Sequence, residues 1–254
     1  MQNIKPSRII IEQLLWRTPS ESFVHEFKDR DEYRLGVLKD GKGVLTLATN
    51  ICVHSLTANK LNNELLSLAG KGVLKVLQTS SAGASLVTSN PAIFCKSERC
   101  GDLLYVNSSM HDYISGFAVV ASTMELDRIR NAVNQSKLPL AGEDLSNLLR
   151  AGRLWYWSRH EAIAAIAIYK VIAVDTVLIT ALCALPTTEC ELCLTELVAC
   201  LHENLGTRYP NLYIYCSRSE VKNTLLSSSD NLDISMVDSL WNIIFLGVNT
   251  DGLL

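Results

Sequence analysis

The clearest hydrophobic pattern in the chain lies in its second half, where apolar runs rich in β-branched and aromatic residues are typical of strands. Residues 153–171, RLWYWSRHEAIAAIAIYKV, predict a hairpin that turns near Arg159 and His160. Residues 175–185 are almost entirely apolar, which is typical of a strand in a sheet that is covered on both faces. Two further short apolar runs predict strands at 211–217 and 240–248.

A helical spacing of three and four residues separates these strands. The best example is residues 188–205, where Leu197, Leu201 and Leu205 belong to one apolar stripe. Thr188 and Glu191 have the spacing of a capping box, and Gly206 is predicted to end the helix. The same reasoning predicts shorter helices at 123–136, with Thr123 as its N-cap, at 142–152 and at 219–228.

The first half of the chain shows a similar order of elements. Residues 32–50 predict a hairpin around Asp40-Gly41, a pair that favours tight turns. The remaining expected elements are helices at 7–16, 23–31 and 55–72, and strands at 73–80, 101–109 and 113–122. Both halves therefore read as hairpin, helix, strand. We predict a mixed α/β (α+β) sheet flanked by helices, with domains at 1–122 and 123–254.

Composition narrows the classes of function. The chain has 254 residues, of which 48% are hydrophobic and 19% are charged, and its net charge is −3. A chain of this length can bury a core as one large domain or two small ones. No run of Lys or Arg is present, so composition does not favour nucleic-acid binding. Lys170 and Asp175 interrupt the longest apolar stretch, 162–186, so we expect no membrane span.

The eight cysteines are scattered, whereas a secreted disulfide scaffold would be shorter and denser in cysteine. We therefore expect reduced thiols and an intracellular, reducing compartment. No signal peptide is visible in residues 1–17. The expected location is the cytoplasm, with the mitochondrion as an alternative because the same segment is mildly basic.

Residues 185–206 concentrate the candidate chemistry, because they hold a C-x-x-C at Cys190 and Cys193 and a third thiol at Cys200. A zinc site there would also recruit His202. However, Cys193 and Cys200 would lie about 10 Å apart along a helix. A redox motif would need a lowered thiol pKa, which neighbouring carboxylates oppose. The third interpretation is a buried stripe of thiols in an ordinary amphipathic helix.

Other candidates carry weaker signals. Cys95 and Cys100 are predicted to flank a charged loop, as a local disulfide, half of a metal site, or free or buried thiols. Cys52 and His54 share one face of an extended segment. The aromatic residues 155–157 are predicted to belong to the core of a sheet. We assign no catalytic and no metal-binding residue.

The order of elements in the second half resembles the acyl-CoA-binding core of the GNAT acetyltransferase superfamily, in the branch that has a GNAT-like N-terminal half. The resemblance makes 153–167 the central hairpin and 175–185 the strand that splays beside acyl-CoA. It makes 188–205 the helix whose N-terminus holds the cofactor pyrophosphate. The first half would then be a divergent GNAT-like half.

The specific motif of the superfamily is absent. After Pro186 the superfamily has Arg or Gln, two residues, Gly, one residue, and Gly or Ala. The corresponding positions in this chain are Glu189, Cys190, Glu191, Leu192, Cys193 and Leu194. Side chains replace bare backbone, and Glu189 and Glu191 place carboxylates where a diphosphate is expected. Two like charges about 4 Å apart repel by roughly 4 kcal/mol at an effective dielectric of 20.

The resemblance also implies a tyrosine general acid on the next helix and an acidic base on the splayed strand. Leu225 and Leu226 occupy the tyrosine region, Asn223 matches a family asparagine, and no acid lies on 177–185.

Three hypotheses for the function follow. The first is a degenerate, non-catalytic GNAT-like subunit without cofactor that binds a protein partner or a second copy. The second is an active acyltransferase that binds acyl-CoA in an unusual way. The third is an unrelated α/β assembly or viral structural protein.

Overall fold

The computed structural model describes eleven stretches of the chain. They are 33–37, 43–46, 51–54, 65–67, 69–70, 76–109, 117–136, 145–173, 175–186, 190–227 and 232–248. These residues belong to two compact units, one of 1–101 with 238–254 and one of 102–237. The second unit contains the position 122/123, at which the sequence predicted a boundary. The strands β5 (Ile93–Ser109) and β11 (Leu232–Val248) each contribute to both units.

The first unit is a mixed sheet with a small core. From its edge inward, the sheet consists of β3 (Ile51–His54), β2 (Gly43–Thr46), β1 (Tyr33–Val37) and β4 (Val76–Ser80). The strands β1 and β4 run parallel, and β4 pairs antiparallel with β11. The helix α3 (Ser81–Thr88) follows β4 and helps to bury Leu77, Val87 and Ile243.

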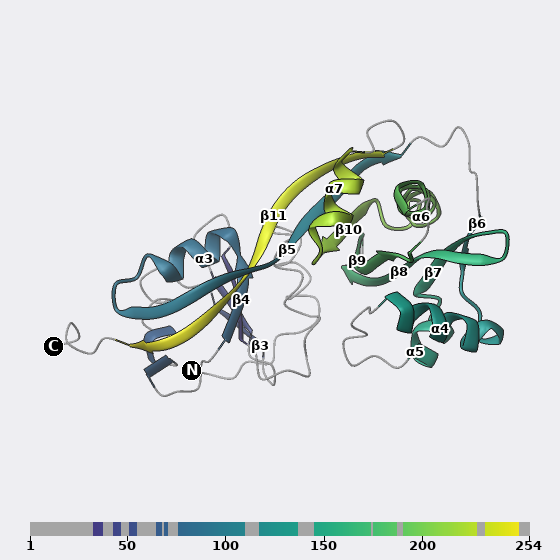
Figure 1. Cartoon of the computed structure of the whole chain (residues 1–254). Helices are drawn as coiled ribbons and strands as arrows, with labels where there is room; N and C mark the ends of the chain where they lie inside the picture. Colours follow the sequence, from purple (N-terminus) through teal and green to yellow (C-terminus); the bar gives the residue numbers. More distant parts are fainter. Residues whose placement is uncertain are drawn as a thin grey trace. The chain divides into compact units, whose positions relative to one another are not determined.

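The second unit holds the longer sheet (Figure 1). After the unit's own parts of β11 and β5, its strands follow in the order β10 (Asn211–Cys216), β9 (Thr176–Ala184), β8 (Ala162–Ala173), β7 (Leu154–Arg159) and β6 (Phe117–Val120). The pair β9 and β10 is parallel, and the pairs from β9 to β6 are antiparallel. The parallel pair requires a crossover, which α6 (Cys190–Gly206) provides.

Helices cover both faces of this sheet. The helix α6 lies on one face, together with α7 (Ser219–Ser227). The short η2 (Thr123–Glu125), α4 (Leu126–Ser136) and α5 (Leu145–Arg150) lie on the other. Along β7, Trp155 and Trp157 face α6, whereas Leu154 and Tyr156 face α4 and α5. Successive residues of this apolar strand therefore serve two cores, one on each face.

Most of the predicted elements are confirmed. The second hairpin turns at His160 and Glu161, whose φ angles of 49° and 64° suit a tight primed turn. The first hairpin is confirmed by the antiparallel pairing of β1 with β2. The predicted helices 7–16 and 23–31 lie outside the described residues, as do Thr188 and Glu189 of the capping motif.

Three local predictions are wrong. Cys95 and Cys100 lie within β5 and do not flank a loop. Five residues of strand span about 16 Å, so a disulfide between them is excluded. Ser122, and not Thr123, is the N-cap of η2. Gly206 is the last residue of α6 and has no positive φ, and the N–H of Tyr209 reaches back to the carbonyl of Leu205 at 2.7 Å.

Candidate functional site

The second unit contains a splay between its two parallel strands. The strands β9 and β10 are paired only from Thr176 with Asn211 to Ile179 with Ile214. Beyond that point β9 stays paired with β8 as far as Ala184, and β10 stays paired with β5 as far as Cys216. Each strand thus follows its outer neighbour, and the two strands separate. This is the opening that the resemblance predicts beside residues 175–185.

The N-terminal end of α6 follows the splayed part of β9. Glu191 is exposed on the first turn, and Leu192 is half-buried. Cys193 and Leu194 are both almost fully enclosed in the core between α6 and the sheet. The side chain of Leu194 therefore points away from the helix end. Of the described residues, Glu191 and Leu192 are therefore the ones whose side chains lie at the N-terminal end of α6.

The walls of the splay are poor in acid–base groups. No Asp or Glu is present on β9 or on β10. The hydroxyl of Thr180 donates to the carbonyl of Ile168 at 3.3 Å, and Cys183 is buried on the face toward α4 and α5. Tyr215 is half-buried on β10, directly after its last residue paired to β9. The described walls therefore offer a phenol and a buried thiol, and no carboxylate.

The helix α7 also departs from the pattern implied by the resemblance. Leu225 is buried in the same core as α6, so this position packs the fold and offers no proton. Asn223 is exposed. The polar contact of α7 is made by Lys222, whose Nζ lies 3.0 Å from the carboxylate of Asp102 on β5. That pair ties the helix to the sheet.

One buried carboxylate was missed by the sequence interpretation. Glu196, in the middle of α6, is 4% exposed, and its Oε2 accepts a hydrogen bond of 2.7 Å from the indole N–H of Trp157. Buried ionisable groups are held by such specific partners. Neither residue signals the other in the sequence, because they are 39 positions apart. The pair fixes α6 over β7.

Cys193, Cys200 and Cys216 are buried groups of the core of this unit. The Sγ of Cys193 lies 3.6 Å from the carbonyl oxygen of Ala164. Burial, aided by Glu203 and Glu196, raises the pKa of Cys200 to about 11. Burial and the nearby Asp102 raise the pKa of Cys216 to about 12, although Lys222 lowers it. Thiols with raised pKa values are poor nucleophiles at neutral pH. Within the described residues, no three His, Cys, Asp or Glu side chains are grouped to hold a metal ion.

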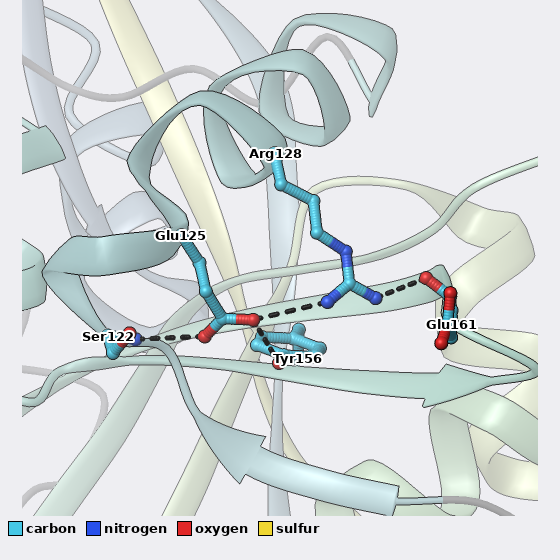
Figure 2. A network of polar contacts seen from close by, with 5 residues as sticks. All are labelled: Ser122, Glu125, Arg128, Tyr156 and Glu161. Carbon is cyan, nitrogen blue, oxygen red and sulfur yellow. Dashed lines mark hydrogen bonds and ion pairs between the residues drawn. The ribbon is translucent and has the colours of Figure 1, made fainter.

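A second polar cluster joins η2 and α4 to the hairpin (Figure 2). The Oε1 atom of Glu125 accepts hydrogen bonds from the phenol of Tyr156 at 2.7 Å and from Arg128 at 3.1 Å. The backbone N–H of Ser122 donates to Oε2, and Arg128 donates to the carbonyl of Glu161.

The hydrogen bond from Tyr156 is the main cause that lowers the pKa of Glu125, and burial raises the pKa of Tyr156. Glu125 is therefore ionised and Tyr156 neutral across the physiological range, and their hydrogen bond clamps η2 to the hairpin.

Among the described helices, none is both long enough and apolar enough to cross a membrane.

Comparison with solved structures identifies the fold. An acetyltransferase from the GNAT family from Colwellia psychrerythraea matches with a TM-score of 0.60 at 10% identity, over 82% of this chain and 79% of that one. A GCN5-related N-acetyltransferase from Kribbella flavida matches with a TM-score of 0.53 at 10% identity, over 98% of both chains. A conserved protein of unknown function from Bacteroides thetaiotaomicron matches with a TM-score of 0.50 at 11% identity, over 95% of this chain and 98% of that one.

No protein-family model matches the sequence, and no curated protein is similar to it. The similarity therefore establishes the GNAT fold, because structural likeness at such low identity carries the fold alone. The predicted resemblance and fold class are confirmed. An unrelated α/β fold is excluded by the same finding.

Proposed function

We propose, starting from the GNAT fold of this chain, that the protein does not use acyl-CoA and acts as a non-catalytic subunit that binds a protein partner or a second copy of itself. The observation that carries the proposal is Glu191. It is exposed on the first turn of α6, where the fold implies a bound pyrophosphate. A carboxylate there repels the anion that the position otherwise attracts.

Magnitudes favour repulsion over attraction at this helix end. The partial positive charge of a helix N-terminus stabilises an anion by about 0.3–1 kcal/mol at an exposed position. One unit charge about 4 Å from another costs roughly 4 kcal/mol at an effective dielectric of 20, and a diphosphate carries more than one charge. Leu192 adds a side chain where close approach requires bare backbone. The balance at this end is therefore against a diphosphate.

The walls of the splay support the same conclusion. A general base and a general acid must lie within hydrogen-bond reach of the reacting group. No carboxylate lies on β9 or β10. Where the superfamily offers a tyrosine on α7, this chain has Leu225, which packs in the core between α6 and the sheet.

One observation favours the alternative of an active acyltransferase. The splay itself is retained between β9 and β10, and Tyr215 lies on β10 just after the last residue paired to β9. In that alternative an acyl-CoA would lie against the splayed strands, and its diphosphate would avoid the start of α6. The two hypotheses differ in whether the folded chain binds CoA at all.

A thermal-shift titration with CoA and acetyl-CoA separates them. A ligand at about 100 times its dissociation constant stabilises the folded state by roughly 2.7 kcal/mol, which raises the Tm of a chain of this size by about 5–10 °C. We expect no such shift up to millimolar ligand. A clear shift at micromolar ligand would overturn the proposal.

Two variants locate the effect. The double variant Glu191→Gln with Leu192→Gly removes the charge and the side chain from the first turn of α6. If it gains a CoA-dependent shift, Glu191 and Leu192 are the obstacle. Glu203→Gln removes an exposed acid from the last turn of the same helix and is the matched control.

The partner-binding part of the proposal has a separate measurement. Light scattering across a concentration series reports whether the chain associates with itself. A monomer at all concentrations leaves a different protein as the partner. A self-associating chain that also binds CoA contradicts the non-catalytic interpretation and leaves the association standing.

A further inference from the structure

The C-terminal end of α6 carries a cluster of cationic and aromatic side chains that the function proposed above does not use. Two residues come from the strands beneath the helix and two follow the helix directly. We name this cluster the arginine–tyrosine rim, and its members are Arg153, Tyr169, Arg208 and Tyr209. It lies at the opposite end of α6 from Glu191.

Backbone contacts place the four residues in two pairs, and both pairs lie at the end of the sheet where α6 ends. The N–H of Tyr169 on β8 donates to the carbonyl of Arg153 at 3.0 Å, which places these two residues side by side at the start of β7. The N–H groups of Arg208 and Tyr209 both donate to the carbonyl of Leu205, at 3.0 and 2.7 Å. This tight turn sets the guanidinium of Arg208 at 5.2 Å from the centre of the Tyr209 ring.

The two tyrosines share one apolar base. Tyr169 and Tyr209 are half-buried, and both pack against the core cluster between α6 and the sheet. Burial and the neighbouring Tyr209 raise the pKa of Tyr169, while Arg153 and Arg208 both lower it. The charge of each arginine thus favours the ionised form of the same phenol, although Arg153 precedes a strand and Arg208 follows the helix.

Among the described residues, the two arginines of the rim have no acidic partner. Within the described part of the chain, no carboxylate lies at ion-pair distance from Arg153 or Arg208. Asp175 starts β9 at the same end of the unit, but its carboxylate accepts from Thr176 at 2.7 Å and from Asn211 at 3.0 Å. Glu203 is exposed on the last turn of α6.

The strand beneath the rim adds one more donor. Trp155 follows Arg153 by two positions and so lies on the same face of β7. Its indole N–H is buried, and among the described side chains it is the one buried polar group without a hydrogen-bond partner. The face of β7 that faces α6 thus holds a buried donor whose hydrogen bond is not made by any described group.

We propose that the arginine–tyrosine rim binds a small oxyanion, a phosphate or carboxylate group of a soluble molecule, between Arg153 and Arg208. The planar guanidinium groups donate paired hydrogen bonds to such oxygens, and the Tyr169 hydroxyl donates a further one. The half-buried aromatic base lowers the local dielectric, which strengthens these contacts relative to open water. The site is independent of the acyl-CoA question, because it lies at the other end of α6.

The structural alternative is that Arg208 serves only the helix. A cation near a helix C-terminus stabilises the helix by about 0.3–1 kcal/mol without any ligand. In that case removal of Arg208 lowers the Tm equally in every salt. An oxyanion site instead predicts that the loss depends on which anion is present.

Thermal-shift titrations test this on the full chain. The probes are inorganic phosphate and acetate, each compared with chloride at matched ionic strength. At about ten times the dissociation constant, we expect the Tm to rise by roughly 3–6 °C over chloride. A larger effect of phosphate identifies a phosphate-bearing ligand, and a larger effect of acetate identifies a carboxylate. Equal effects of all three salts would overturn the proposal.

Variants place the effect at the rim. The double variant Arg153→Gln with Arg208→Gln removes both guanidinium groups and abolishes the oxyanion-specific shift. Arg130→Gln, an exposed arginine of α4, is the matched control and keeps it. An unchanged shift in the double variant would place the anion elsewhere, for example at the start of α6, and would overturn the assignment.

Chemical protection gives a second measurement on the unmodified chain, which remains informative if the double variant does not fold. Phenylglyoxal reacts with exposed arginines, and peptide mapping reports each position. We expect phosphate to slow the modification of Arg153 and Arg208 and to leave Arg130 unaffected. Equal rates with and without phosphate at all three positions count against the site.

Discussion

The two ends of α6 differ in charge in a way that the fold alone does not predict. The N-terminal end has an exposed carboxylate, Glu191, where the resemblance to the GNAT superfamily predicts an anion site. The C-terminal end has Arg153 and Arg208 next to two tyrosines. The comparison teaches that the side chains of one turn decide the sign of the local potential, whatever the fold around them.

The N-terminal end also obeys the electrostatics of an isolated helix, whereas the last turn of α6 holds an acid, Glu203, and no base. Acids favour the positive N-terminal end and bases favour the negative C-terminal end, each by about 0.3–1 kcal/mol. Helix stability alone therefore accounts for the acid at the N-terminal end and not for the mixed charges at the C-terminal end. It does not account for the aromatic base of the rim or for the splay beside Glu191. The following predictions separate these contributions, from the largest expected effect to the smallest.

The position of α6 on the sheet controls both ends together. Leu197 is fully buried in the middle of the helix. Leu197→Ala leaves a cavity, and we expect a loss of about 2–5 kcal/mol in the free energy of unfolding, measured by denaturant titration. The half-buried Leu192 is the control, and Leu192→Ala is expected to cost less than half as much. Equal losses would show that the helix packs at its end as tightly as at its centre.

The buried bond between Glu196 and Trp157 sets the rotation of the helix. Glu196→Ala leaves the indole N–H unpaired, so we expect a loss of about 1–3 kcal/mol in the free energy of unfolding. Glu196→Gln keeps an acceptor and is expected to lose less. If the rim depends on the rotation of α6, Glu196→Ala also weakens the phosphate-specific shift. A stabilised Glu196→Ala variant would show that desolvation of the carboxylate outweighs its hydrogen bond.

Much of this arrangement was predictable from local patterns. The two apolar runs in 153–171, separated near Arg159 and His160, predicted β7, β8 and their turn, and the helical spacing in 188–205 predicted α6. The start of β5 was missed because Lys96, Ser97, Glu98 and Arg99 are all exposed and give no apolar alternation. The strand β3 and the helix α3 were missed as well, since each is short.

The candidate sites were less predictable than the fold. The splay follows from the resemblance, and the residues at the start of α6 could be named from the sequence. The bond between Glu196 and Trp157 and the rim could not, since each joins residues from elements far apart in the chain. Their only local signal is an acid within an apolar helix stripe and two arginines beside aromatic residues.

The clamp on the opposite face of the sheet gives a pH-dependent comparison that leaves α6 untouched. The folded-state pKa of Glu125 is lowered, mainly by the hydrogen bond from Tyr156. Its contribution is therefore present above the unfolded pKa of about 4.3 and is lost as the pH falls through the folded value.

We expect Glu125→Gln to cost about 1–2 kcal/mol at pH 7 and much less in acid, measured by urea titration at each pH. Asp127→Asn changes an acid that is 91% exposed and is the control. A loss for Glu125→Gln that does not vary with pH would contradict the ionised clamp.

The smallest effects compare the two ends of α6 directly through one kind of substitution. Glu191→Gln removes an acid from the positive end of the helix, and Glu203→Gln removes one from the negative end. We expect a loss of about 0.3–1 kcal/mol for the first and a gain of similar size for the second, both reduced at high salt. Thermal unfolding at low and at high ionic strength measures both.

The comparison becomes decisive when CoA is added to the same two variants. If helix stability alone selected Glu191, Glu191→Gln loses stability and gains no ligand. If the acid also excludes a diphosphate, the same variant loses stability without ligand and recovers it with CoA, whereas Glu203→Gln responds to CoA as the unmodified chain does. A CoA response shared by both variants would mean that the charge at the start of α6 does not control binding, and the splay itself would then be the determinant.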